Sequence, residues 1–573
     1  MVFFSLLSYT TIFDAIQRTH RLRFFVSRYA KSTAATPGGR PHRSPALHHM
    51  WTSSRRVASL SRVTYHIRDI IRIVIVFSGK VVMYFIGIDI GTSATKLLLM
   101  DEKGSVLRLV QKTYPTCFLE PGWSEQNPES WWKAVCAGIP ELLDGFDAGE
   151  VKGMGACGQM HGLVTLDKND RIIRPAILWN DSRTRYQVDY LNHDVGRATL
   201  ARHTGNVAYT GFTAPKLLWM REEEPENFGR VARMMLPKDY VNYRLTGVHS
   251  TDFSDASGTL LLDVEHKRWS KTMLSICGLR ERQVPELFES SEVIGEVMPD
   301  VADALGLPHG VKVCAGAGDN AAAAVGTGSV GAGHCNIVMG TAGTILIPTE
   351  GYLCDKENQL HAFCSADGGW NLMGCILSAA GCARWWIEDV VGTGDYPSEE
   401  ERIQESNLGQ NGVYFLPYLM GERTPHNDPR ARGAFVGMRM DTTRADMTQA
   451  VLEGVAFALR DCLQVARAEE VDVNASTICG GGTHSRLWNS IVADILGIPL
   501  IITQTEQAPA FGAAMLASVA CGVYPSVKDC SRRLVHLKET VWPDRRIIAS
   551  YQGHYFTWHQ MYPALKGIYQ QML

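Results

Sequence analysis

The segment from Asp89 to Lys96, with the sequence DIGTSATK, combines a carboxylate, hydroxyl groups and a lysine within eight residues. Small side chains let backbone N–H groups approach an anion, and Thr92 and Ser93 add hydroxyl donors. Lys96 can neutralise phosphate charge, whereas Asp89 would repel a phosphate unless Mg²⁺ lay between them. The segment therefore predicts a phosphate-binding turn with Asp89 directed toward a metal ion. A plain hairpin with polar turn residues is the alternative.

Two further glycine-rich segments have a similar character. Gly340–Thr344 reads GTAGT, and Gly480–Ser485 reads GGGTHS after an apolar run. Glycines permit close backbone approach to a planar or phosphorylated ligand. The turn at Asp89 and its counterpart Gly340–Thr344, facing each other across a cleft, would hold a polyphosphate from both sides. The presence of both is a more specific indication of a phosphate site than either one alone. A flexible turn is the alternative for Gly480–Ser485, although such a turn seldom needs three glycines.

Asp319 follows the apolar run Val311–Ala315 and a glycine turn, and the Ala-rich stretch after it is typical of a helix. An aspartate that only caps a helix needs no catalytic role. The flanking glycines and alanines leave space for a ligand at the carboxylate, which favours a general base.

Polar side chains also gather in Gly158–Gly162, with the sequence GQMHG, and in Pro175–Arg183, which contains LWNDSR. Gln, His, Asn, Asp and Arg converging on one region would suit a polyhydroxylated ligand, and Trp179 offers an aromatic face to sugar C–H groups. A lone histidine such as His161 is more often structural, so both interpretations stay open.

Alternating apolar residues and turn signals predict a mixed α/β chain from residue 84 onward. The expected elements are strands over 84–89, 96–100 and 106–112, a helix over 131–143, and a second strand–turn–strand unit over 332–339 and 345–348. Two halves that open in the same way indicate an internal duplication, with a boundary near 325–333 and a cleft between two lobes. The G-x-G-x-x-G pattern at 326–331 follows a helical stretch, not a strand, so we exclude a dinucleotide site there.

The composition is that of an ordinary globular chain. The 573 residues are 45% hydrophobic and 20% charged, with a formal net charge of -3, which excludes disordered, collagenous and small disulfide-rich classes. This charge favours neither nucleic acid nor a membrane. The 14 cysteines form no C-x-x-C pair and no zinc-spaced cluster, which favours reduced thiols and a cytoplasmic location. No segment is apolar enough to predict a transmembrane helix.

Residues 1–82 differ from the rest. They hold 13 Lys and Arg but only 2 acidic residues, a net of +11, so the other 491 residues carry -14 to reach the total of -3. A translation start at Met83 is the preferred interpretation, because the fold-like pattern begins there. An organelle transit peptide and a functional basic arm are the alternatives.

With these motifs in place, the sequence resembles the FGGY carbohydrate kinases of the actin/hexokinase/Hsp70 ATPase superfamily. The resemblance extends from Met83 to the C-terminal end. Besides the segment at Asp89, it rests on Gly122–Pro128, Gly158–Gly162, Arg174–Arg183, Gly211–Leu217, Leu236–Tyr240, Gly318–Asn320 and Tyr418–His426.

The resemblance implies an α/β fold of the two-lobed actin-like ATPase type (ribonuclease H-like) with an inter-lobe cleft. Residues 83–330 would form an N-terminal sugar-binding lobe and residues 331–573 a C-terminal nucleotide-binding lobe. Residues 1–82 would be a basic extension outside the folded enzyme, because the family has nothing that matches them.

The resemblance also implies roles for individual residues. Asp319 matches the catalytic base and Asp89 the aspartate needed for Mg-ATP and the metal. The residues expected at the sugar are Met160, His161, Asp319 and Asn320, and those expected at the nucleotide are Thr92, Ser93, Lys96, Gly340, Thr341, Gly481 and Gly482. The sequence departs from the usual family pattern at Ala342, where serine is common, and at Thr483-His484.

The expected reaction is the ATP-dependent phosphorylation of D-xylulose to D-xylulose 5-phosphate in pentose catabolism, with Mg²⁺. A ketose and ATP are the expected partners, nucleic acid and membrane are not, and a homodimer is left open. Alternatives are a kinase of L-ribulose, L-fuculose, gluconate or glycerol, a non-kinase ATPase of the actin/Hsp70 type, and an inactive sensor. Retention of both Asp89 and Asp319 argues against the sensor.

Overall fold

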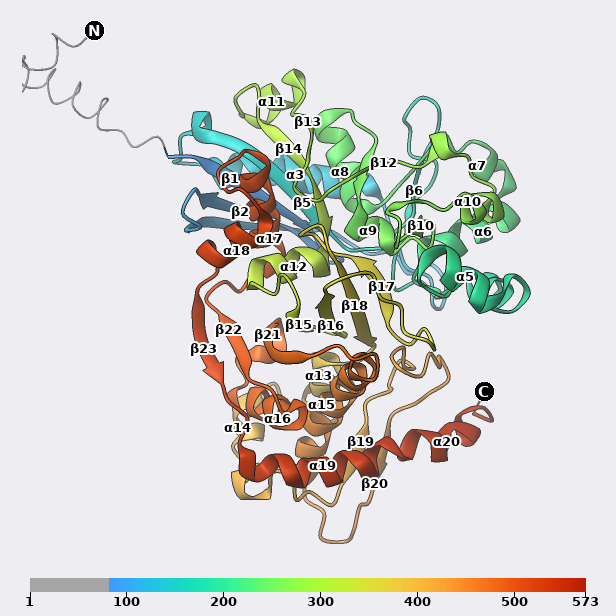
Figure 1. Cartoon of the computed structure of the whole chain (residues 1–573), viewed down its shortest axis with the longest axis vertical. Coiled ribbons are helices and arrows are strands. Elements are labelled where there is room, and N and C mark those ends of the chain that lie inside the picture. Colours follow the sequence, from blue (N-terminus) through green and yellow to red (C-terminus); the bar gives the residue numbers. More distant parts are fainter. Residues whose placement is uncertain (1–81, 573) are drawn as a thin grey trace, which may run out of the picture. The chain divides into compact units, whose positions relative to one another are not determined.

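The computed structural model describes residues 82–572, shown in Figure 1. The expectations for residues 1–81 therefore lie outside the described residues. Two mixed β-sheets dominate the described part, and each is covered by helices on its two faces. The mixed α/β class expected from the sequence is confirmed.

The first sheet has six strands, and β1 lies near its centre. β1 is antiparallel to β2, which is antiparallel to β3, while β1 and β5 are parallel. This is the antiparallel meander expected from the sequence. In spatial order the strands are β13 (Val293–Glu296), β14 (Lys312–Gly318), β5 (Val151–Gly158), β1 (Tyr84–Ile90), β2 (Ala94–Asp101) and β3 (Val106–Thr113).

The second sheet repeats this arrangement. β15 is antiparallel to β16 and parallel to β21, as β1 is to β2 and β5. The repeated pairing supports the internal duplication. In spatial order its strands are β17 (His361–Cys364), β18 (Trp370–Ile376), β16 (Gly343–Thr349), β15 (Gly333–Met339), β21 (Val473–Cys479), β22 (Leu500–Thr503) and β23 (Leu537–Val541).

Both faces of the first sheet are buried, so its central strands are apolar almost without interruption. Ile86 and Ile88 face a core built with Trp131 of α3 (Pro128–Leu143). Phe85 belongs to the opposite core, which contains Phe511 of α17 (Ala508–Ala520). Because successive strand residues alternate between faces, neighbouring positions reach different helices.

Two helices each contact the sheet of the other half of the chain. α12 (Asp319–Thr327) follows β14 of the first sheet but also contacts β15, β16 and β21 of the second. α17 comes from the second half of the chain and covers β1 and β5 of the first sheet. In Figure 1, α12 lies between the two sheets. A Cβ added to Gly326 or Gly512 would lie 2.1 Å from Ala508 O or 1.9 Å from Ala322 O, so only glycine allows this close contact.

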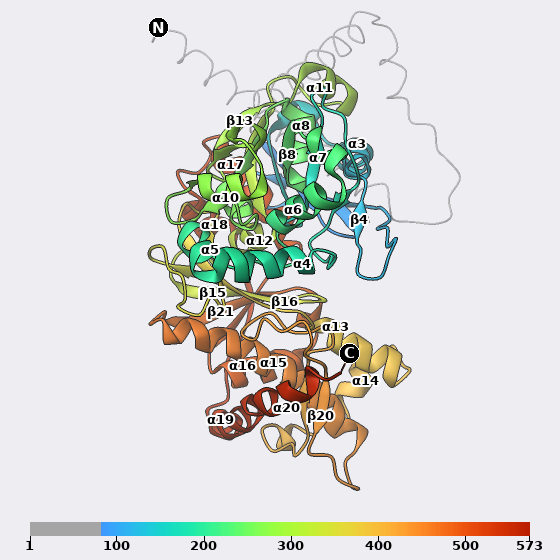
Figure 2. The same ribbon diagram turned by 90° about the vertical axis from the view of Figure 1, so that its right-hand side faces the viewer.

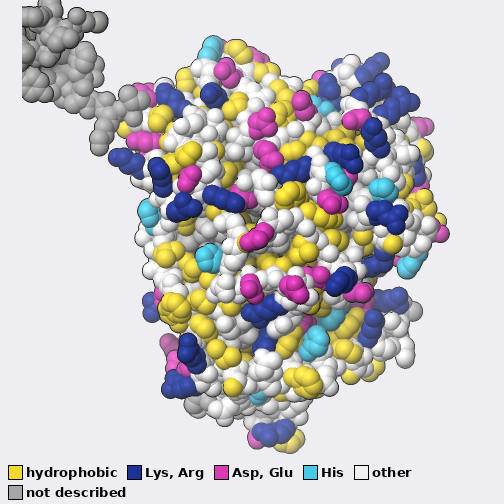
Figure 3. Space-filling view, in the orientation of Figure 1, with side chains coloured by type: hydrophobic (Ala, Val, Ile, Leu, Met, Phe, Trp, Pro, Cys, Tyr) yellow, Lys and Arg dark blue, Asp and Glu magenta, His cyan; other side chains and the backbone are white. Residues whose placement is uncertain are grey.

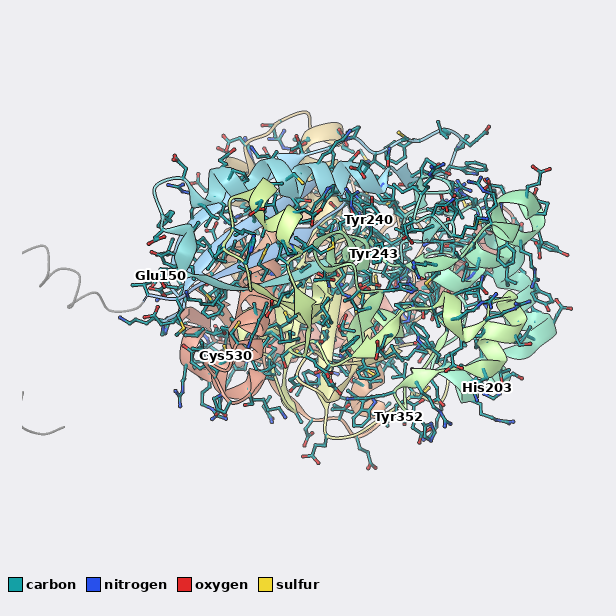
Figure 4. All side chains as sticks on the ribbon, turned by 90° about the horizontal axis from the view of Figure 1, so that it is seen from above. Glu150, His203, Tyr240, Tyr243, Tyr352 and Cys530 are labelled. Carbon is teal, nitrogen blue, oxygen red and sulfur yellow. The ribbon has the colours of Figure 1, made fainter. Side chains whose placement is uncertain are left out.

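Residues 164–288 form a helical region beside the first sheet. α5, α6, α7 and α10 lie together at the right of Figure 1. Tyr240 and Tyr243, labelled in Figure 4, lie on α8, and the Tyr240 hydroxyl donates a 3.0 Å hydrogen bond to Glu129 of α3. Elements of the first half outside its sheet are β4 (Glu125–Gln126), β6 (Val164–Leu166), β7 (Ala176–Ile177), α4 (Arg185–Asp189), α5 (Arg197–Thr204), α6 (Thr213–Glu223), α7 (Pro225–Gly229), β8 (Arg233–Met235), α8 (Pro237–Thr246), β9 (Ser250–Asp252), α9 (Phe253–Ser257), β10 (Leu262–Asp263), β11 (Arg268–Trp269), α10 (Lys271–Cys277), β12 (Glu286–Phe288) and α11 (Pro299–Leu305).

The second half adds a long buried helix, α15 (Arg444–Ala468), which packs against β16 and β18 of its sheet. α19 (Arg545–His559) and α20 (Met561–Tyr569) are the last two helices of the described chain; Figure 2 shows them in red and α15 in orange. Outside its sheet, the second half contains α13 (Ala380–Arg384), α14 (Tyr396–Glu400), β19 (Tyr414–Leu416), β20 (Ala434–Val436), α15 (Arg444–Ala468), α16 (Arg486–Leu496), α17, α18 (Val527–Leu534), α19 (Arg545–His559) and α20 (Met561–Tyr569).

Charges of both signs are distributed over the face seen in Figure 3, in keeping with the small net charge. All 14 cysteines are unpaired thiols. Within residues 82–572, no helix has the length and apolar character needed to cross a membrane.

Candidate active site

Asp89 lies near the carboxyl end of β1, where β1 pairs with Lys96 of β2 and Cys157 of β5. The residue is 8% exposed. Burial raises the pKa of the Asp89 carboxyl to about 6 because water no longer solvates its charge. The Lys96 ammonium and the Cys157 thiol, with Sγ 3.9 Å from Asp89 Oδ1, act in the opposite direction.

Asp319 is the first residue of α12. The expected glycine turn before it is wrong, because β14 continues through Gly318. Gly316 makes this possible, since it has φ of +76° and a Cβ there would lie 1.8 Å from Ala156 O. Asp319 therefore projects from the point where a strand of the first sheet passes directly into the helix between the sheets.

The Asp319 carboxylate is held by its neighbour. Its Oδ1 accepts hydrogen bonds from Asn320 N at 2.7 Å and Asn320 Nδ2 at 2.9 Å. Burial and, to a smaller extent, the negative charge of Asp89 raise the pKa of Asp319 to about 7, although the two Asn320 hydrogen bonds act in the opposite direction. The structure thus brings the two predicted carboxylates into each other's electrostatic field.

The turn after β1 uses its hydroxyls differently. Thr92 Oγ1 accepts a 3.0 Å hydrogen bond from the Trp179 indole and donates one of 3.3 Å to Gln159. Ser93 is exposed and Lys96 is half-buried. Thr92 therefore orients Trp179, whereas Ser93 is the hydroxyl that the turn presents to solvent.

The two glycine-rich loops of the second half lie side by side. β15 and β21 are parallel neighbours, with Val338 opposite Cys479, so both loops leave the same edge of the sheet. A Cβ on Gly480 would lie 2.7 Å from Met339 O, which places the loops against each other. The four residues predicted to contact nucleotide, Gly340, Thr341, Gly481 and Gly482, are thereby gathered in one place.

Met160 and His161 follow β5 and are buried. Met160 packs directly on the residue before Asp319, because a Cβ on Gly318 would lie 2.9 Å from Met160 Sδ. His161 Nδ1 lies 2.8 Å from Gly258 O. Burial lowers the pKa of His161 to about 3, so its ring is neutral at physiological pH.

Lys216 of α6 has a role that sequence reasoning missed. Its fully buried Nζ donates hydrogen bonds to His161 O at 3.0 Å and to Gly211 O at 2.5 Å. Burial lowers the pKa of Lys216 to about 7. Its presence in the family-like stretch Gly211–Leu217 was the available signal, but no spacing rule connects it with His161.

Arg423, from the second half, reaches the same region. Its Nη2 would lie 3.3 Å from a Cβ on Gly211, and its guanidinium lies 5.4 Å from the Tyr209 ring. Nearby, a hollow of about 500 Å³ is lined by residues 118–124, Asn180 and Met420. Because Asn180 follows Trp179, this hollow opens beside the polar cluster, and residues of both halves line it.

Family profiles described as the N-terminal and C-terminal domains of the FGGY family of carbohydrate kinases match residues 84–326 and 335–521. The chain belongs to the FGGY family of carbohydrate kinases. The expected family, its enzyme class and its two-lobed actin-like ATPase fold are thus confirmed.

Individual relatives of this FGGY kinase match over most of its length. It is 40% identical over 483 residues to a xylulose kinase of Escherichia coli strain K12, covering 84% of this chain and 99% of that protein. A solved structure of a xyloylose kinase from Brucella ovis has a TM-score of 0.80 at 38% identity, over 85% of this chain and all of the other. A gluconate kinase structure from Lactobacillus acidophilus has a TM-score of 0.82 at 26% identity, over 86% of this chain and all of the other.

Proposed function

We propose that this FGGY kinase transfers the γ-phosphoryl group of ATP to the terminal hydroxyl of D-xylulose, giving ADP and D-xylulose 5-phosphate in pentose catabolism. The observation that carries the proposal is the Asp319 carboxylate, placed at the start of the helix between the two sheets, with a pKa of about 7. The xylulose kinase of E. coli, at 40% identity, supports the choice of sugar.

Asp319 acts as the general base. A carboxylate whose pKa lies near the working pH is a stronger base than an ordinary aspartate and is still ionised in a large fraction of the molecules. As the sugar hydroxyl attacks phosphorus, its proton passes to Asp319 and the bond between the γ-phosphorus and the bridging oxygen breaks. Phosphoryl transfer depends mainly on positioning and charge stabilisation, so a single well-placed carboxylate suffices as base.

Donors for the phosphates come from both halves. Ser93 lies in the turn after β1 and Lys96 in β2 opposite Asp89, whereas Gly340, Thr341, Gly481 and Gly482 belong to the two adjacent loops of the second half. Backbone N–H groups fixed in this way need no reorganisation when charge develops on the phosphoryl oxygens. Thr92 lies in the same turn, but its hydroxyl is hydrogen-bonded to Trp179 and Gln159. Its contribution to nucleotide binding is therefore the backbone of the turn.

Asp89 fits a magnesium ion that keeps most of its water ligands. Carboxylate oxygens suit this cation, and because burial raises the pKa of Asp89, a nearby cation would favour its charged form. Within residues 82–572, no cluster of three or more His, Cys, Asp or Glu side chains could enclose a metal. When bound, Mg²⁺ would offset phosphate charge; Asp89 would hold it through water.

The sugar lies against Met160, His161, Asp319 and Asn320. Because Gly258 O can only accept a hydrogen bond, His161 Nδ1 carries the ring proton and Nε2 is an acceptor. A neutral His161 therefore accepts a hydrogen bond from a sugar hydroxyl. Movement of the lobes toward each other would exclude water and limit ATP hydrolysis.

A panel of sugars with coupled ADP detection tests the proposal. D-xylulose should give the highest kcat/KM among D-xylulose, L-ribulose, L-fuculose, gluconate and glycerol. The gluconate kinase of L. acidophilus makes gluconate the specific competitor. ATP turnover that no sugar stimulates would favour the non-kinase ATPase and refute the proposal.

Three further proposals concern the setting of the enzyme. Residues 1–82 lie outside the working enzyme, so a chain starting at Met83 should match the full chain in the same assay. The unpaired thiols support a cytoplasmic location. A homodimer is the proposed assembly, and light scattering that gives a monomer mass of 63.3 kDa would contradict it.

A further inference from the structure

A buried polar network of one lysine and three aspartates lies close to Asp319, and the proposed reaction does not use it. Lys238 Nζ lies 2.6 Å from Asp239 Oδ1, 2.9 Å from Asp252 Oδ1 and 3.6 Å from Asp255 Oδ2. All four side chains are fully buried. A lysine with three carboxylates inside a protein is costly to maintain, so its position next to the site needs an explanation.

The network reaches the backbone at Asp319 through one serine. Ser254 Oγ, which is 1% exposed, donates a hydrogen bond to Asp252 Oδ2 and accepts one of 3.1 Å from Gly318 N. Gly318 is the residue immediately before Asp319. Since the hydroxyl proton of Ser254 is committed to Asp252, a lone pair is left directed at Gly318.

Asp252 is itself held from several sides. Besides Lys238, its carboxylate accepts hydrogen bonds from Ser254 N at 2.8 Å and from Ser290 Oγ at 2.9 Å. Asp252 caps the start of α9, while Lys238 comes from α8. The network therefore joins two helices of the first half to the end of β14.

Asp319 needs such an anchor because its own hydrogen bonds are local. Both come from Asn320, the next residue, which is held in turn by Thr344 of the second sheet. Neither bond therefore fixes the carboxylate relative to the first half, where Met160 and His161 lie. On its other side, Gly318 is confined between Ser254 and the Met160 thioether. The direction of the carboxylate relative to the sugar thus depends on where Gly318 is held.

We propose that Ser254, supported by Asp252 and Lys238, is a positioning residue that sets the orientation of Asp319 through the Gly318 amide. The inference rests on the proposed role of Asp319 as the base. It predicts that weakening this connection lowers the rate of phosphoryl transfer while the binding of both substrates is retained, because misorientation of the reacting groups reduces kcat.

The test compares two serines of α9 in the full chain. Ser254→Ala removes the acceptor of Gly318 N, and Ser257→Ala removes the acceptor of Cys364 N, which donates a 3.0 Å hydrogen bond to Ser257 Oγ. Both serines are buried, and each variant leaves one backbone N–H and one oxygen acceptor without its serine partner, Asp252 for Ser254 and Phe253 O for Ser257.

For Ser254→Ala we expect kcat to fall by roughly 3- to 10-fold, the scale of one hydrogen bond, with the KM of sugar and of ATP changed less than 2-fold. Ser254→Thr, which keeps the hydroxyl, should restore kcat. Hydrogen exchange at residues 313–320 should become faster in Ser254→Ala alone. Ser257→Ala should lower the melting temperature with kcat unchanged.

A wild-type kcat in Ser254→Ala, or an equal loss of kcat in Ser257→Ala, would overturn the inference. If Ser254→Ala does not fold, Asp252→Asn takes its place, because an amide oxygen is a weaker acceptor for the Ser254 hydroxyl; an unchanged kcat there also overturns it. The assay uses the best sugar of the panel. A preference for another carbohydrate would thus refute D-xylulose as substrate and leave this inference standing.

Discussion

Thr344 of β16 donates a 2.8 Å hydrogen bond to Asn320 Oδ1, and the amide nitrogen of the same Asn320 side chain donates to Asp319. The second sheet therefore reaches the candidate base through two hydrogen bonds. A shift of β16 relative to α12 would change the orientation of the Asp319 carboxylate. Asn320 therefore links the position of the second sheet to the base that projects from the first.

Removal of the Asp319 carboxylate should abolish most of the activity. Asp319→Ala is expected to lower kcat by at least ~10², the usual scale for loss of a general base, with ATP affinity nearly intact. Steady-state kinetics and nucleotide titration measure the two effects. Asp300→Ala, which changes an exposed aspartate in the first turn of α11, is the control and should retain normal kinetics. Near-normal turnover in Asp319→Ala would remove Asp319 from the reaction.

The same carboxylate should cost the protein stability at high pH. Its folded pKa of about 7 lies above the ordinary aspartate value, so the folded state binds this proton more tightly than the unfolded state. That contribution is present at low pH and is lost as pH rises through about 7. Asp319→Asn cannot ionise, so its melting temperature relative to wild type should rise between pH 5 and pH 8, measured with EDTA and without nucleotide. A difference that stays constant with pH would contradict the assigned pKa.

Lys216 should matter for the sugar and not for ATP. Lys216→Met removes both hydrogen bonds that hold the backbone at His161 and Gly211. Because each of these hydrogen bonds contributes on the order of 1 kcal/mol and their loss would leave two buried carbonyl oxygens without this donor, we expect the KM for the sugar to rise by about 10-fold while the KM for ATP is unchanged. Lys133→Met, on the exposed face of α3, is the matched control. An equal rise in both KM values would indicate general disruption instead.

A serine at position 342, which the family resemblance leads us to expect there, should tighten nucleotide binding. Ala342→Ser adds a hydroxyl between Thr341 and Gly343, at the turn assigned to the phosphates. One additional hydrogen bond predicts a decrease in the KM for ATP of about 2- to 5-fold. Ala332→Ser, in the exposed loop before β15, provides the comparison and should have no effect. An unchanged KM in Ala342→Ser would place the phosphates elsewhere.

Strands were predicted well because the alternation of apolar residues and the turn residues that indicate them lie within a few neighbouring positions. The expected strand over 84–89 corresponds to β1, and the helix over 131–143 is α3, which begins three residues earlier at Pro128 with Asn127 as its cap. The glycine turn before Asp319 was wrong because Gly316 serves a close approach to Ala156 inside a strand. Glycine permits both conformations, and only the neighbouring strand decides between them.

Contacts between residues far apart in the chain could not be predicted from the sequence. Ser254 and Gly318 are 64 positions apart, and Lys216 and His161 are 55 apart. No period or spacing relates such pairs, since their approach depends on how whole elements pack. The carboxylates at Asp89 and Asp319 could be singled out from their glycine-rich surroundings, whereas the groups that orient them became visible only in three dimensions.

The placement of α17 has a consequence for truncated forms of the protein. This helix lies beyond residue 507, yet it covers the first sheet, where a Cβ on Gly87 would lie 1.8 Å from Ala510 O. A chain that ended between β14 and Ala508 would lack this helix and leave bare the apolar face of the first sheet that contains Phe85, Leu98 and Met100. During synthesis, the first half must therefore wait for the last stretch of chain before its core is complete, and prematurely terminated products should aggregate or be degraded.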